Sequence, residues 1–187
     1  TLTDIKKWLN TWSELKNELY FGEMVWLRRH LSMRIFRLGR LQFALEHSKY
    51  DCPQYGLRKG DPVIGVHIPA DGPMTAEECD VSFAMARTFF ARYFPEHTYR
   101  FFTCHSWLLD TELRNMLSDN SNIIQFQKRF INIANDPSDA ILRYVFKWNT
   151  TALNLKYAPV LTVFAQNVKS AYLSGTQFHE PFGIIEK

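Results

Sequence analysis

Two short segments of the chain carry side chains whose types and positions could support catalysis. His67 stands at the end of one apolar run, and Cys104, His105 and Ser106 stand at the end of another. A histidine can act as a general base because its ordinary pKa lies close to neutral pH. A cysteine can act as a nucleophile when a neighbouring group stabilises its thiolate. We therefore take these four side chains as the candidate catalytic residues.

Each of these side chains also has an ordinary structural interpretation. Cys104 could be a small buried apolar side chain, and either histidine could form hydrogen bonds in the interior. His67, Cys104 and His105 are also three potential zinc ligands, but their spacing matches no standard zinc motif. We therefore predict no metal site, and the catalytic and structural interpretations both stay open.

The elements that must position these candidates form a strand–helix–strand unit. The apolar runs 62–68 and 99–104 predict two buried strands, and a helix is predicted between them that ends before Pro95. Thr75 and Glu78 match the capping box that opens many helices. A right-handed crossover would make the two strands parallel. Their carboxyl ends then meet at one edge of the sheet, which is where open α/β sheets bind ligands.

The turn before this helix, residues 70–75, could bind a phosphate group. Helix N-termini hold anions through free backbone N–H groups and the helix dipole, and Gly72 would allow close approach. Against this, Pro73 lacks an N–H group, Asp71 would repel an anion, and no glycine-rich phosphate motif occurs in the sequence. An ordinary capped helix is the simpler interpretation of these residues alone.

The first part of the chain combines helical and strand patterns. Apolar residues at helical spacing predict helices over 3–19 and 23–31. Alternation of apolar and polar residues predicts a half-buried strand over 40–46. This strand could begin near Met33, with Gly39 marking a bend.

The second half of the chain is predicted to be mainly helical. Capping residues and prolines predict four helices, which begin near Asp110, Asn122, Pro137 and Pro159. Asp136 would cap the third of these helices, and Gly175 would close the fourth. The apolar tail 182–185 predicts a final strand.

Composition favours one globular domain of mixed helix and strand. Of 187 residues, 46% are hydrophobic and 22% are charged, as is usual for a soluble domain. The three cysteines are widely spaced and odd in number, which argues against a disulfide framework and for a cytoplasmic location. No apolar run is long enough to span a membrane, and no signal peptide is visible. Because the first residue is Thr1 and not Met, we expect that another domain precedes this one.

The net charge of +3 is too small to indicate a nucleic-acid-binding protein. One basic run also contains aromatic residues, a combination that can bind RNA or phosphate. Its arginines are Arg28, Arg29, Arg34, Arg37 and Arg40. We expect a solvated charged surface here, with RNA or phosphate binding as the less favoured alternative.

Four short segments, in this order, resemble the GNAT-like C-terminal domain of bacterial acyltransferase-domain proteins. They are FRLGRLQF (36–43), VHIP (66–69), CHSWLLD (104–110) and SNI (121–123). The resemblance implies the α/β (α+β) fold of the Gcn5-related N-acetyltransferase superfamily, in which a mixed sheet is flanked by helices. Two central parallel strands splay apart in that fold, and coenzyme A binds in the gap. The resemblance also implies a main domain over 33–187, preceded by a helical N-terminal segment over 1–32.

The resemblance implies that an acyl-coenzyme A is the co-substrate and that an amine is the acceptor. The amine would attack the thioester carbonyl directly, with His67 or His105 moving the proton. The pantetheine arm would lie along the first central strand, and the pyrophosphate would lie at the start of the capped helix. The residues implied to bind the coenzyme are Val66, Ile68, Pro69, Gly72, Met74 and Thr75.

The sequence departs from the superfamily in two places. The superfamily's phosphate loop reads approximately Q/R-x-x-G-x-G/A, whereas residues 68–75 read IPADGPMT and contain only Gly72. The superfamily also has an acidic base on the first central strand, where His67 is the only titratable residue of this chain. Two functions therefore stay open: an acyl-CoA-dependent N-acyltransferase, and a non-catalytic module that binds a partner protein or another ligand.

Overall fold

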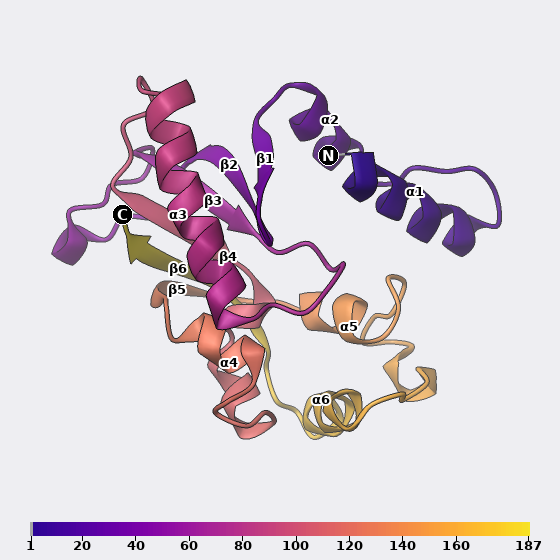
Figure 1. Ribbon diagram of the computed structural model, residues 1–187. Coiled ribbons are helices and arrows are strands. Elements are labelled where there is room, and N and C mark those ends of the chain that lie inside the picture. Colours follow the sequence, from indigo (N-terminus) through magenta and orange to yellow (C-terminus); the bar gives the residue numbers. More distant parts are fainter. Residues whose placement is uncertain (1) are drawn as a thin grey trace.

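The computed structural model describes residues 2–187, which form a six-stranded sheet with helices on both faces and at one end (Figure 1). The helices are α1 (Leu2–Lys16), α2 (Met24–Leu31), α3 (Ala76–Tyr93), α4 (Asn122–Gln127), α5 (Ala140–Val145) and α6 (Val163–Leu173). The strands are β1 (Ile35–Leu38), β2 (Leu41–His47), β3 (Pro62–His67), β4 (Phe101–His105), β5 (Ile131–Pro137) and β6 (His179–Glu186). This mixed α/β architecture confirms the predicted fold class. None of the helices within residues 2–187 is long and apolar enough to cross a membrane.

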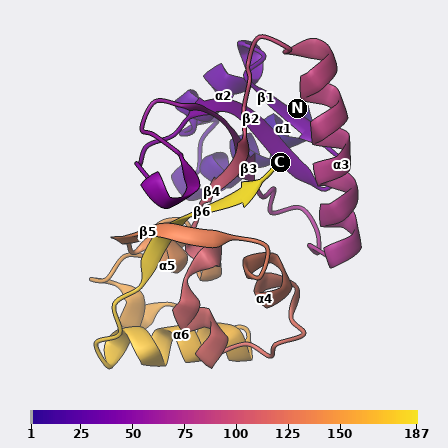
Figure 2. The same ribbon diagram turned by 90° about the vertical axis from the view of Figure 1, so that its left-hand side faces the viewer.

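The sheet is mixed, with two parallel strands at its centre. The strand order is β1-β2-β3-β4-β6-β5, and only the β3–β4 pair is parallel. The long helix α3 makes the crossover between β3 and β4 and lies along one face of the sheet (Figures 1 and 2). The strand–helix–strand unit predicted from the sequence is therefore present with parallel strands.

The two central strands separate toward their carboxyl ends. The β3–β4 pairing consists of Ile64 with Phe102 and Gly65 with Thr103. Each strand continues to pair with its outer neighbour, because β2 pairs with β3 as far as His67 and β6 pairs with β4 as far as His105. Beyond Gly65 and Thr103, a gap therefore opens between two strands that stay anchored in the sheet.

The helix α3 starts where the capping box predicts it. Thr75 accepts a hydrogen bond from the backbone N–H of Glu78, and the Glu78 carboxylate accepts one from the backbone N–H of Thr75. Below the helix, the Phe83 ring lies 5.7 Å from that of Phe43 and 5.1 Å from that of Phe102, centroid to centroid, and the two sheet rings lie 5.8 Å apart. Burying a ring of this size contributes about 1.5–3 kcal/mol, so this cluster fixes α3 against β2 and β4.

The opposite face of the sheet carries α2. Along β3, Ile64 and Val66 belong to the core under α3, so the alternation of side chains turns His67 toward the other face. There the Trp26 ring of α2 lies 4.9 Å from the His67 ring, centroid to centroid. Asp4 of α1, which is buried, accepts one hydrogen bond from Trp26 and pairs with His30, and this ties α1 to α2.

Three details of the predicted secondary structure are wrong. Residues 35–47 form a β1–β2 hairpin rather than one bent strand, because Gly39 adopts a φ of +68° that allows a tight turn. Residues 131–137 form the edge strand β5, and Pro137 ends this strand instead of opening a helix. The final helix begins at Val163, where the Thr162 hydroxyl caps it, and not at Pro159.

Candidate active site

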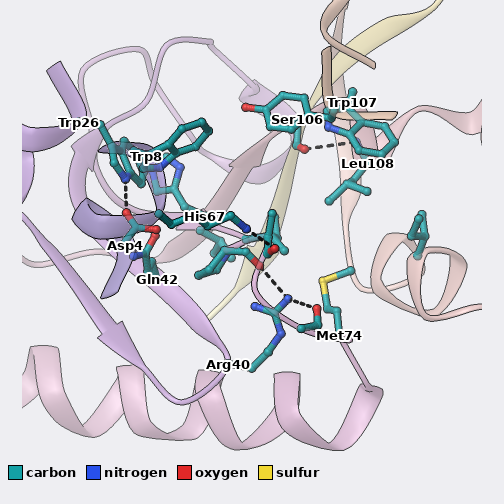
Figure 3. Close-up of a pocket in the computed structure, with 18 of the residues that line it drawn as sticks. Asp4, Trp8, Trp26, Arg40, Gln42, His67, Met74, Ser106, Trp107 and Leu108 are labelled. Carbon is teal, nitrogen blue, oxygen red and sulfur yellow. Dashed lines mark hydrogen bonds between the residues drawn. The ribbon is translucent and has the colours of Figure 1, made fainter. Parts of the chain in front are cut away.

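A cavity of about 520 Å³ lies at the gap between β3 and β4 (Figure 3). Its walls come from the ends of both strands, from the loop that leads to α3, and from α1, α2, α4 and α5. His67, His105 and Ser106 all line it, so the structure brings three of the four catalytic candidates together. The helices α1 and α2 belong to the same site, because Trp8 and Trp26 form part of its wall.

The candidate coenzyme-binding residues also gather at this cavity. Val66, Ile68, Pro69, Gly72 and Met74 line it, as one continuous wall that follows β3 and the loop after it. Thr75 does not line the cavity, and its hydroxyl instead caps α3. The backbone of this wall has unused donors, because no hydrogen bond among the described residues uses the N–H groups of Ala70, Gly72 or Met74.

Arg40 holds the loop 69–73 from below. Its guanidinium donates hydrogen bonds to the carbonyl oxygens of Pro69 at 2.8 Å, Gly72 at 2.6 Å and Pro73 at 2.6 Å. The residue is only 8% exposed, so the expectation that this arginine lies on a solvated surface is wrong. One arginine of the basic run is therefore buried and holds the loop in place. The sequence did not indicate this role, because the carbonyl groups that Arg40 contacts lie about 30 residues later in the chain.

Asp71, which was expected to repel an anion at this loop, is paired with arginines. Arg37 donates hydrogen bonds to its carboxylate, and Nη1 of Arg40 lies 3.6 Å from Oδ1. The hydrogen bond from Arg37 lowers the pKa of Asp71, and the charges of both arginines act in the same direction. The charge of this carboxylate is therefore offset where the loop approaches the helix N-terminus.

His67 presents one of its two ring nitrogens to charged neighbours. Its Nε2 lies 3.3 Å from Oε1 of Glu46 on β2 and 3.4 Å from Nη1 of Arg29 on α2. Among the described residues, none forms a hydrogen bond with Nδ1, the other ring nitrogen. His67 is thus the strand-end histidine with a nitrogen free to exchange a proton. Glu46 was also missed, although alternation along β2 places it on the same face as Gln42, which pairs with His67.

His105 has both ring nitrogens occupied. Its Nε2 lies 3.1 Å from Oδ2 of Asp136, and its Nδ1 lies 3.4 Å from Nζ of Lys49. Tyr50 donates a hydrogen bond to the same Asp136 carboxylate, and this bond raises the pKa of Tyr50 to about 12. These contacts leave neither ring nitrogen of His105 without a partner, in contrast to Nδ1 of His67.

Ser106 and Cys104 both have structural roles: the Ser106 hydroxyl caps a short helix, and Cys104 is packed in the core. The Ser106 hydroxyl accepts a hydrogen bond from the backbone N–H of Leu108 and caps a short 3-10 helix, although the residue still lines the cavity. Cys104 is 1% exposed and belongs to the core under α3. Burial raises the pKa of its thiol far above the ordinary value. The geometry therefore gives a nucleophilic thiolate no support, and within residues 2–187 no group of side chains is arranged to hold a metal ion.

Four aromatic rings form part of the wall of the cavity. Trp8 of α1 packs against Trp148 at 4.9 Å, Tyr144 packs against Trp148 at 5.0 Å, and Trp107 stacks on Tyr144 at 5.9 Å. All four rings line the cavity. This wall joins residues that are 140 positions apart, and it offers an apolar surface to a bound ligand.

Gln42 brings an unused donor to the same cavity. It is 1% exposed, it lines the cavity, and its Nε2 has no hydrogen-bond partner among the described residues. Buried polar groups are nearly always hydrogen-bonded, so a ligand with an acceptor oxygen would fit beside this amide.

Comparison with known proteins finds a matching family and similar solved structures. The family model described as GNAT-like C-terminal domain matches residues 35–185. Among curated proteins, none matches the sequence. Among solved structures, the chain is similar to an acyltransferase in complex with decanoyl-CoA and teicoplanin, at 30% identity and a TM-score of 0.85. It is also similar to an acyltransferase in complex with decanoyl-CoA, at 32% identity and a TM-score of 0.84.

A third similar structure is a mutant acyltransferase in complex with octanoyl-CoA, at 28% identity and a TM-score of 0.85. Each of these similarities covers 99% of the chain and 56% of the solved structure. The chain thus spans little more than half the length of the proteins that it resembles.

Proposed function

The chain belongs to the family of GNAT-like C-terminal domains, and on this premise we propose that it binds an acyl-CoA and transfers the acyl group to an amine. The observation that carries the proposal is the parting of β3 and β4 beyond Gly65 and Thr103, beside the cavity. The similar structures contain decanoyl-CoA or octanoyl-CoA, which supports an acyl-CoA as the ligand.

The residues at the cavity fit the parts of a coenzyme A thioester. Beyond Gly65, the edge of β3 that faces β4 has no strand partner within residues 2–187, so its backbone can hydrogen-bond the amides of a pantetheine arm. The free N–H groups of Ala70, Gly72 and Met74 and the N-terminus of α3 can hold the pyrophosphate. Arg40 fixes this loop from below, and this supports phosphate binding without the superfamily's glycine motif.

The chemistry assigned to the chain's own residues is proton transfer at His67. An acyl-CoA supplies the acyl group as a reactive thioester. As the N–C bond forms and the C–S bond breaks, Nδ1 of His67 accepts a proton from the amine, and the sulfur leaves with its electron pair as a thiolate. General base catalysis of this kind contributes roughly 10²–10⁴-fold to a rate.

The aromatic wall supports an acyl group longer than acetyl. A chain that lay against Trp8, Trp107 and Trp148 would bury its methylene groups, and each buried methylene contributes about 0.8 kcal/mol. We therefore expect octanoyl-CoA and decanoyl-CoA to bind more tightly than acetyl-CoA. The amine acceptor is proposed as a class, and the three free cysteines support a location in the cytoplasm.

Calorimetric titration with coenzyme A, acetyl-CoA and octanoyl-CoA tests the proposal. We expect a dissociation constant in the micromolar range for octanoyl-CoA, which corresponds to about −8 kcal/mol. Arg40→Gln should weaken binding of all three ligands, because the loop loses its three-carbonyl anchor. Arg58→Gln is the matched control, since Arg58 precedes β3 at the opposite end of the strand.

Three outcomes would contradict the proposal in different ways. No heat at millimolar ligand with the folded protein would remove acyl-CoA as the ligand. Tight binding with no transfer to any of a panel of amines would favour the non-catalytic module. Equal affinity for acetyl-CoA and octanoyl-CoA would remove the role of the aromatic wall.

A further inference from the structure

Glu46 reaches His67 from the neighbouring strand. Its Oε1 lies 3.3 Å from Nε2 of His67 and 2.6 Å from Nη1 of Arg29, so the imidazole and the guanidinium meet at the same carboxylate oxygen. Glu46 pairs with Val63 across the sheet, four residues before His67. Its side chain must therefore lie along the face of β3 to reach the ring.

Gly65 provides the space for this path. A Cβ atom at position 65 would lie 2.3 Å from Oε2 of Glu46 and 2.6 Å from its Cδ, which is closer than such atoms approach. A glycine in the interior of a strand weakens the strand and often marks a close approach by another group. Here the approaching group is the Glu46 carboxylate that contacts His67. A glycine at position 65 therefore leaves the space through which Glu46 reaches the ring.

Glu46 is ionised in this setting. Burial opposes its charge, but the hydrogen bonds and charges of His67 and Arg29 overcome that effect and lower the pKa of Glu46 to about 2. The carboxylate can therefore only accept hydrogen bonds. Nη1 of Arg29 lies 3.4 Å from Nε2 of His67, but its short contact, at 2.6 Å, is the hydrogen bond that it donates to Glu46. Nε2 of a neutral His67 must then carry the proton in order to donate to the same carboxylate. The other nitrogen, Nδ1, is then the unprotonated one.

We propose that Glu46 is a positioning residue for His67: it fixes the proton on Nε2, leaves Nδ1 free to act as the base, and stabilises the imidazolium that forms. The inference rests on the proposed function, in which His67 accepts the proton of the amine. A carboxylate that holds a histidine in one tautomer plays this part in serine hydrolases. Arg29 and the Trp26 ring complete the setting from α2, which lies before the residues that the family model matches.

Steady-state kinetics provides the first test. Glu46→Gln keeps the size of the side chain but removes its charge, and we expect kcat to fall while KM for the acyl-CoA stays within about threefold. The loss should lie between about tenfold and about 10⁴-fold, the range for carboxylates that orient a functional histidine. Glu186→Gln, which breaks the surface pair of Glu186 with Arg100, is the matched control and should leave kcat unchanged. An unchanged kcat in Glu46→Gln, with the wild-type protein active, would overturn the proposal.

The tautomer of His67 provides a test that needs no turnover. In ¹⁵N-histidine-labelled protein above pH 8, the ring nitrogens of His67 should show the Nε2–H tautomer, and His67→Gln assigns the signals. Glu46→Gln should introduce the Nδ1–H tautomer, because a glutamine amide can donate to Nε2. A wild-type His67 that already carries its proton on Nδ1 would overturn the proposal.

A double-mutant cycle with Gly65 separates positioning from general damage. Gly65→Ala should displace the flexible end of Glu46 and lower kcat in a protein that still folds. In the Glu46→Gln background, the same substitution should lower kcat much less, because the contact is already lost. Fully additive losses would overturn the proposal.

Failure of the proposed function and failure of this inference give different results. If no acyl-CoA binds, the proposed function fails, and the nitrogen signals still report whether Glu46 fixes the His67 tautomer. If turnover proceeds but both Glu46→Gln and Gly65→Ala match the wild-type kcat, the proposed function stands and the positioning role fails.

Discussion

His67 and His105 end two neighbouring parallel strands, yet their surroundings differ in kind. At the end of β3, His67 is held at Nε2 by Glu46 and contacts the Trp26 ring of α2, with Nδ1 free. At the end of β4, His105 has Asp136 at Nε2 and Lys49 at Nδ1. The two side chains are exposed to nearly the same extent, 30% for His67 and 28% for His105, so access to solvent does not distinguish them.

The difference lies in how many ring nitrogens the protein uses. A histidine exchanges protons when one nitrogen is fixed by a partner and the other is free. His67 meets this condition, whereas the contacts of His105 join β4 to β5 and to the residues after β2. The comparison supports the proposal that His67, and not His105, transfers the proton.

The largest expected effect comes from removing each ring in turn. His67→Ala should lower kcat by roughly 10²–10⁴-fold, because the general base is lost. His105→Ala should lower it by less than about tenfold, since His105 lines the cavity without a free nitrogen. Turnover of an acyl-CoA with an amine, measured on variants with wild-type circular dichroism, checks this. A similar fall in kcat in both variants would show that the two histidines do not differ in their importance for turnover.

An intermediate effect should appear in the pH dependence of stability. The pKa of Glu46 is lowered from 4.5 to about 2 in the folded state, so its contribution is complete above pH 4.5 and is lost as pH falls toward 2. This difference corresponds to about 3 kcal/mol. Urea unfolding at pH 5.5 and pH 3 should therefore show a steeper loss of stability for the wild type than for Glu46→Gln. If the wild type and Glu46→Gln lost equal stability between pH 5.5 and pH 3, the ionised Glu46 carboxylate would not stabilise the fold through His67 and Arg29.

The smallest effect is expected at the other strand end. Tyr50→Phe removes the hydrogen bond to Asp136, so it should lower the free energy of unfolding by about 0.5–1.5 kcal/mol. Its kcat should match the wild type, because Tyr50 does not line the cavity. Thermal unfolding and turnover assays measure the two quantities. A tenfold drop in kcat would bring the His105 cluster into the reaction.

Local signals in the sequence predicted the central unit of the fold correctly. The capping box at Thr75 and Glu78 needs only residues within one helical turn, and the apolar runs of β3 and β4 are continuous. The edge strand β5 was missed because its segment reads INIANDP, which is polar, ends in proline and is mostly accessible to solvent. It becomes a strand by pairing with β6, about 50 residues later in the chain.

The candidate site was predicted only in part for the same reason. His67, His105 and Ser106 follow predicted strands, and the rule that ligands bind at the carboxyl ends of parallel strands located them. Arg40, Glu46 and Gln42 lie on or beside β2, and nothing in their local sequence shows which groups they face. Their partners, such as the carbonyl of Gly72, are brought near by the sheet and by the loop before α3.

The sequence by itself determined the starts of α3 and α4, the buried strands β3 and β4, and the types of side chain at the strand ends, because these depend on neighbours within a few positions. Only the tertiary structure decided that Cys104 is enclosed in the core, that Arg40 organises the loop, and that Glu46 lies against His67. Burial, ion pairing and the choice of tautomer depend on groups that are distant in sequence. The folded sheet alone brings those groups within hydrogen-bonding distance.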